Sequence, residues 1–171
     1  VAAAAPAAAP AADGSLPAPV AGAGATGAFE LGGHALELNA GTVGVMRRSG
    51  MSWVKFQHRY SPGQDPSAVA GIINSARTNG FKILVAVVGS PAELGANFDG
   101  YTAAFATFLG GVAALNPEAI EVWNEPNIDR EWPAGQINGG TYTRMLAASF
   151  NAIKARNPNT IVISGAPAPT G

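Results

Sequence analysis

Two adjacent polar residues at the end of a short apolar segment form the most reactive arrangement in this sequence. Residues 120–127 read Ile-Glu-Val-Trp-Asn-Glu-Pro-Asn, so residues that favour an extended strand lead directly into Asn124 and Glu125. Pro126 restricts the backbone of Glu125 and holds it at a fixed angle at the strand end. A carboxyl beside an indole and partly shielded from water suits general acid catalysis, and the Asn124 amide can bind a neighbouring hydroxyl.

The same segment carries a second carboxylate. Strand alternation predicts that Glu121, Trp123 and Glu125 share one face. Four residues separate the two glutamates, which is about 13 Å along a strand and too far for both to act on one bond. We therefore expect Glu125 to act with a carboxylate from elsewhere.

Trp-Asn-Glu-Pro-Asn at residues 123–127 resembles the fourth-strand signature of the retaining glycoside hydrolases of clan A, which are built on (β/α)8 barrels. The resemblance implies that Asn124 binds a sugar 2-hydroxyl, that Glu125 is the catalytic acid/base and that the substrate is an oligo- or polysaccharide. The alternative is an ordinary turn after a strand. The apolar strand before the motif and the helical pattern after it favour the family.

The resemblance also implies roles on strands one and two. The family carries an arginine on strand two that hydrogen-bonds the nucleophile, and Lys55 falls nearest that position, which is a departure. Lysine lacks the bidentate fork of arginine, so Arg59 is the candidate substitute. His34 is a candidate for a sugar hydroxyl contact, whereas we expect His58 to be a packed or capping histidine.

Trp132 follows the motif in a loop on the expected active-site side of the barrel. Sugar rings stack on flat aromatic surfaces, so Trp132 is a candidate subsite platform. The equal alternative is that it only packs the loop. We expect Trp53, Phe105 and Phe108 to be core residues.

The family's nucleophile is a glutamate at the end of strand seven, and no position here corresponds to it. Asp129 and Glu131 lie in the loop after strand four, where carboxylates are usually solvated or capping groups. We therefore expect this chain alone to be inactive as a retaining hydrolase.

Composition narrows the class of protein. The 171 residues carry a net charge of -1 and 12% charged residues, which suits one soluble domain and gives no charge field for nucleic acid. With no cysteine and two histidines, no metal site or cofactor is expected, and no apolar run is long enough to span a membrane.

Residues 1–28 are Ala, Pro and Gly with one charged residue, Asp13, and predict a low-complexity tail or linker. Such a segment can follow a cleaved signal peptide, which favours a secreted protein. Ordering this tail would require a partner surface.

From residue 29 onward, short apolar strands alternate with helical segments. We expect strands at residues 29–33, 52–60, 82–88, 120–125 and 160–164, and helices at 42–49, 66–79, 99–115 and 141–156. Asp65 and Asp99 are the expected caps of the second and third helices. This pattern fits a barrel or a doubly wound sheet, but no dinucleotide-binding glycine motif follows the first strand. The resemblance favours an α/β fold in which residues 29–171 form the first five βα units of a (β/α)8 barrel.

A closed barrel needs eight strands, so this barrel is incomplete and its first and fifth strands are expected to be open edges. Either the polypeptide continues past Gly171 or a protein partner closes the half barrel. Two other functions stay open: a secreted structural or interaction subunit of a larger assembly, and a non-catalytic carbohydrate-binding module.

Overall fold

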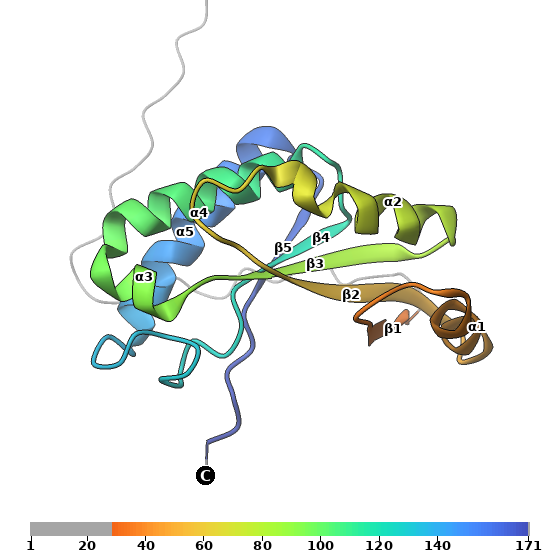
Figure 1. Cartoon of the computed structure of the whole chain (residues 1–171), viewed down its shortest axis with the longest axis horizontal. Coiled ribbons are helices and arrows are strands. Elements are labelled where there is room, and N and C mark those ends of the chain that lie inside the picture. Colours follow the sequence, from red (N-terminus) through yellow and green to blue (C-terminus); the bar gives the residue numbers. More distant parts are fainter. Residues whose placement is uncertain (1–28, 171) are drawn as a thin grey trace, which may run out of the picture.

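Five parallel strands and their connecting helices make up the described part of the chain in the computed structural model (Figure 1). The structure describes residues 29–170, so the tail predicted at residues 1–28 lies outside the described residues. The elements are β1 (Leu31–His34), α1 (Ala40–Arg48), β2 (Met51–Arg59), the 3-10 helix η1 (Pro66–Val69), α2 (Ala70–Thr78), β3 (Lys82–Val88), α3 (Pro91–Ala96), α4 (Phe98–Ala113), β4 (Ala119–Val122), α5 (Gly139–Arg156) and β5 (Ile161–Ser164).

The strand order distinguishes the two folds that the sequence allowed. Each strand pairs in parallel with the next one in the chain, in the order β1-β2-β3-β4-β5. A doubly wound sheet reverses its order at a switch point and so carries helices on both faces. Here the order never reverses, and α2, α4 and α5 lie on the same side of β3 and β4 (Figure 1). The predicted partial (β/α)8 barrel is confirmed.

Helix ends follow the expected chemistry in most places. The Asn39 side chain caps α1, and Gly50 takes the left-handed conformation just after it, with φ of 71°. Asp65 is a cap as predicted, although the first turn that it starts is a 3-10 helix. The predicted Asp99 cap of α4 is wrong. The cap is Asn97, two residues earlier, whose side chain accepts a hydrogen bond from the Gly100 N–H. The short helix α3, capped by Ser90, was not predicted.

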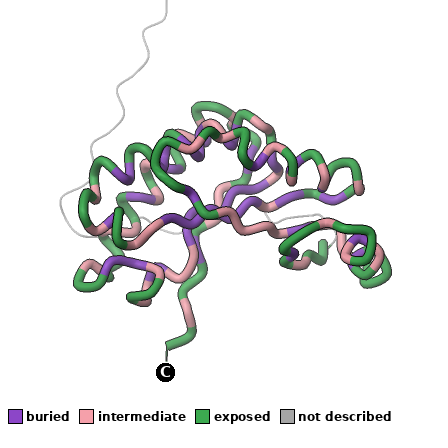
Figure 2. The backbone as a smooth tube through the Cα atoms, viewed as in Figure 1, coloured by how far each residue is buried: buried purple, intermediate pink, exposed green. Residues whose placement is uncertain are grey.

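The core lies between the sheet and the helices. Val54, Val85 and Ile120 occupy one face of three neighbouring strands and have no exposed surface. Phe105 and Phe108 of α4 are buried against this face, as predicted, and the His58 ring stacks on Phe108 at 5.7 Å. Figure 2 shows the buried backbone concentrated in the middle of the sheet.

The opposite face of the sheet carries a charged pair. Lys55 and Glu121 lie on β2 and β4, and their side chains form an ion pair with a separation of 2.6 Å between Nζ and Oε2. Trp53 also faces this side and lines a cavity of about 420 Å³, so its predicted place in the core is wrong. Its indole N–H donates to Glu30 at the amino-terminal end of the sheet, where a polar partner is available. This face is the interior of the partial barrel.

Candidate active site

The backbone turns sharply where β4 ends. Trp123 and Glu125 both have positive φ, at 69° and 47°, which is uncommon for residues other than glycine. The predicted shared face for Glu121, Trp123 and Glu125 is therefore wrong. Glu121 reaches Lys55 on the interior face, whereas the Trp123 ring packs against Phe105 of α4 at 5.5 Å. Left-handed residues cost free energy and concentrate at functional sites, so this strand end is a site candidate on geometry as well as on sequence.

The Trp123 side chain fixes the loop that follows β4. Its indole N–H donates to the Glu131 carbonyl at 2.7 Å, and its backbone N–H donates to the Val87 carbonyl of β3 at 2.8 Å. The ring is fully buried and meets the Trp132 ring at 5.3 Å. The loop is thereby folded back over the end of its own strand.

Glu125 lies at the carboxyl end of β4 with its side chain 24% exposed. Its backbone N–H donates to the Ala166 carbonyl at 3.0 Å, and its Oε2 accepts a hydrogen bond from Arg130 Nη2 at 2.9 Å. This bond raises the pKa of the Arg130 guanidinium. Arg130 is 71% exposed, and its Nε also lies 3.7 Å from Glu131, so both loop carboxylates contact one solvated guanidinium. A pair this open to solvent is screened by water and can yield to a ligand.

The sheet brings four of the predicted residues to one edge. Asn124 is half-buried beside Glu125 at the end of β4. Arg59 is exposed at the end of β2, where its guanidinium donates to the Gly89 carbonyl at the end of β3. His34 is the last residue of β1. Parallel strands end on the same side, so all four lie along the carboxyl edge, where (β/α)8 barrels carry their active sites.

Trp132 does not offer a stacking surface. Its side chain has no exposed area, and its ring packs against those of Phe98, Trp123 and Tyr142 at 6.4, 5.3 and 5.8 Å. Its indole N–H donates to the Gln136 carbonyl. A sugar platform needs an open face, so this geometry corrects the platform interpretation and matches the packing alternative.

Two other carboxylates lie near the site. Glu121 has a side-chain exposure of 6% and is neutralised by Lys55, which accounts for a lysine at this position on β2. Asp129 is exposed in the loop, as expected for a solvated carboxylate.

Among residues 29–170, no group of three or more His, Cys, Asp or Glu side chains could hold a metal ion. In the same part of the chain, no helix has the length and apolar character to cross a membrane.

Two residues at the site had no assigned role in the sequence analysis. The Tyr142 hydroxyl donates to the Val122 carbonyl and accepts from the Gly165 N–H, which links the ends of β4 and β5. The Asn127 side chain pairs with the backbone of Ala168. The partners of Tyr142 and Asn127 lie 20 to 41 positions away in the sequence. The only sequence signal for these contacts was Asn127 itself, a polar residue directly after Pro126.

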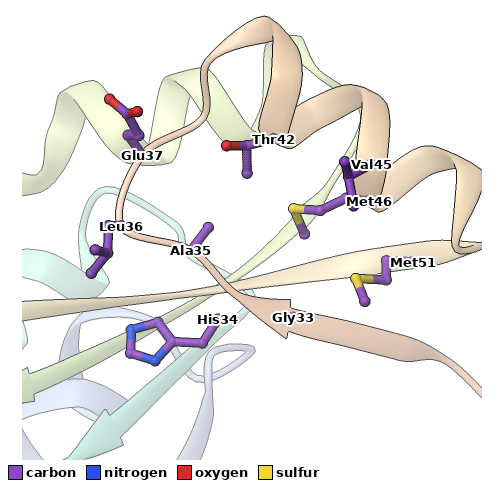
Figure 3. Close-up of a pocket in the computed structure, with 9 residues that line it drawn as sticks. All are labelled: Gly33, His34, Ala35, Leu36, Glu37, Thr42, Val45, Met46 and Met51. Carbon is purple, nitrogen blue, oxygen red and sulfur yellow. The ribbon is translucent and has the colours of Figure 1, made fainter.

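A sizeable cavity lies away from Glu125. It has a volume of about 560 Å³ and is formed by β1 and α1, with Leu36, Met46 and Met51 among its apolar residues (Figure 3). The His34 imidazole points to the other side of β1 from Ala35 (Figure 3). The cavity offers apolar packing surface without converging catalytic groups, so we assign the site to the β4 end on its chemistry.

No protein-family model matches the chain, and no curated protein matches it either. Among solved structures, it is similar to a GH5-4 broad specificity endoglucanase from Clostridium longisporum, with a TM-score of 0.61 and 12% sequence identity. The match covers 77% of this chain and 45% of that chain, so this chain spans less than half the length of the endoglucanase. The likeness shows the partial barrel fold alone.

Proposed function

We propose that this chain is the acid/base half of a retaining glycoside hydrolase acting on O-glycosyl bonds of an oligo- or polysaccharide. The observation that carries the proposal is the position of Glu125: partly exposed, in a left-handed conformation, at the carboxyl end of the fourth strand of a singly wound sheet. Asn124 beside it is the proposed ligand for a sugar hydroxyl. Arg59 and His34 on the same edge are the proposed further substrate contacts.

The proposed reaction has two steps. Glu125 first donates a proton to the departing glycosidic oxygen while a second carboxylate attacks the anomeric carbon. Glu125 then takes a proton from water as the water displaces that carboxylate. The two carboxyl groups must lie about 5 to 5.5 Å apart. We propose that the nucleophile comes from a later strand of the barrel, outside this chain, and that the chain alone has no turnover.

One observation favours a second candidate function, a non-catalytic carbohydrate-binding module. The Lys55 ammonium is held by Glu121, so it is not available to orient a nucleophile. In that case the chain would bind an oligosaccharide without hydrolysing it. We propose secretion for either function, on the composition of residues 1–28.

The test replaces Glu125 in the natural protein that contains this chain. Glu125→Gln removes the proton donor, and we expect about 100- to 10,000-fold slower hydrolysis of glycosides with poor leaving groups. Activated aryl glycosides should be affected less, because their leaving groups need no proton. Asp129→Asn is the matched control in the same loop. Unchanged hydrolysis in Glu125→Gln would refute the proposal, and calorimetric binding of an oligosaccharide without turnover in the unmodified protein would support the second candidate.

A further inference from the structure

We propose that Asn127 is a positioning residue for Glu125, which it holds by tying the loop after β4 to the segment after β5. This inference rests on the proposed acid/base role of Glu125. Asn127 Nδ2 donates to the Ala168 carbonyl at 2.9 Å, and Asn127 Oδ1 accepts from the Ala168 N–H at 2.7 Å. One side-chain amide thus pairs with both backbone groups of a residue 41 positions later.

The paired segments continue the sheet past its last strand residues. The Gly165 N–H donates to the Val122 carbonyl, and the Glu125 N–H donates to the Ala166 carbonyl. Asn127 adds the third point of attachment with its side chain. Pro126 lies between the two attached loop residues and is buried. The strained backbone of Glu125 is therefore held on both sides, by its own N–H and by the amide two residues later.

This arrangement directs the Asn127 amide toward the backbone. Each of its polar atoms bonds to Ala168, with one N–H and one lone pair left over, so we expect its main effect on the reaction to pass through the backbone to Glu125. A general acid needs its carboxyl within hydrogen-bond reach of the departing oxygen, and an error of about 1 Å can cost about 100-fold in rate. Loss of the amide should therefore weaken proton donation more than substrate binding.

Gly165 supports the same conclusion. A Cβ at this position would lie 2.8 Å from the Trp123 carbonyl oxygen and 3.1 Å from that of Val122. The segment after β5 can approach the end of β4 this closely only because residue 165 has no side chain. Close approach brings Ala168 within reach of the short Asn127 side chain.

The kinetic test compares three variants in the natural protein that contains this chain. Asn127→Ala should slow hydrolysis of poor-leaving-group substrates about 10- to 100-fold through kcat, with KM unchanged and activated aryl substrates nearly unaffected. Asn127→Asp keeps the acceptor for the Ala168 N–H and should lose less. Asn74→Ala, an exposed asparagine on α2, is the matched control. An equal loss on both substrate classes, or no loss in Asn127→Ala, would overturn the inference.

A second measurement does not depend on activity. Amide hydrogen exchange on the chain itself should show faster exchange at Ala168 and Glu125 in Asn127→Ala than in Asn74→Ala. Unchanged exchange at Ala168 would also overturn the inference. The two proposals fail separately: full activity in Glu125→Gln removes the acid/base role, whereas a damaged Glu125→Gln beside an intact Asn127→Ala removes only the positioning role.

Discussion

The end of β4 and the edge strands β1 and β5 differ in how far their residues are buried and held by neighbouring segments. All four residues of β4 are buried, whereas β1 and β5, also of four residues, contain no buried residue. Trp123, Glu125 and Asn127 after β4 are held by hydrogen bonds to β3 and to the segment after β5. Within residues 29–170, the chain therefore supplies extensive support for its candidate acid/base residue, whereas β1 and β5 each pair with only one strand.

The open sides are apolar. Leu36 and Val45, beside β1, are 86% and 54% exposed, and Phe150 of α5 and Ile161 of β5 are 46% and 52% exposed. A closed barrel has no strand edges, and open edges can pair with other chains. The rest of a barrel would cover both surfaces, which agrees with the proposal that the nucleophile is supplied from outside this chain.

The largest expected effect contrasts two isoleucines on neighbouring strands. Ile120→Ala in β4 should lower the free energy of unfolding by about 2 to 5 kcal/mol, because the side chain is fully buried. Ile161→Ala in β5 should cost less than about 1 kcal/mol while its side chain is half exposed. Urea titration of both variants measures the difference. A cost for Ile161→Ala equal to that for Ile120→Ala would show that the interior face of the sheet at β5 is covered in solution.

A smaller effect is expected at the tightly packed end of β3. A Cβ on Gly89 would lie 2.2 Å from the Tyr101 hydroxyl and 2.7 Å from the Trp123 ring, so Gly89→Ala should destabilise by about 1 to 3 kcal/mol. Gly71→Ala on α2 is the control: nothing lies within 4 Å, and alanine should stabilise this helix by about 0.5 to 1 kcal/mol. Thermal unfolding measures the change in stability of both variants. Equal melting temperatures for the two variants would contradict the packing at Trp123.

The smallest effect concerns the hydroxyl that links β4 to β5. Tyr142→Phe removes its bonds to Val122 and Gly165 and should cost about 0.5 to 1.5 kcal/mol, because the Gly165 N–H still donates to the Val122 carbonyl. Burial also raises the pKa of Tyr142, as it does for Tyr60 and Tyr101.

These shifts have a defined sign. A tyrosine with a raised pKa in the folded protein stabilises it fully below the unfolded value of about 10, and this contribution is lost as the pH rises through the folded value. The free energy of unfolding should therefore fall above pH 10, and tyrosinate absorbance should appear at higher pH in the folded protein than in urea. Identical titration curves in both states would contradict the buried environment.

Local chemistry made much of the fold predictable. The almost continuous apolar run at residues 82–88 gave β3 its observed limits, and the predicted cap Asp65 acts through a short-range hydrogen bond. The geometry of the site was harder to predict from the sequence. The positive φ of Trp123 and Glu125 has no sequence signal in residues other than glycine, so alternation misplaced Trp123.

The remaining errors have a similar cause. Trp132 is buried by rings from α4 and α5 that lie 10 or more positions away, and Trp53 finds a polar partner in Glu30. The Asn127 pairing joins residues 41 positions apart. Predictions from the sequence located the candidate acid/base residue, but the contacts that hold it come from tertiary structure.

The unreversed strand order also bears on how the protein is synthesised. Each new strand finds its partner in the strand made just before it, so every βα unit can dock as it leaves the ribosome. β4 gains its second neighbouring strand only when β5 emerges. The hydrogen bonds between the Asn127 side chain and Ala168 can form only after that. Glu125 would then reach its final geometry only after β5 has docked.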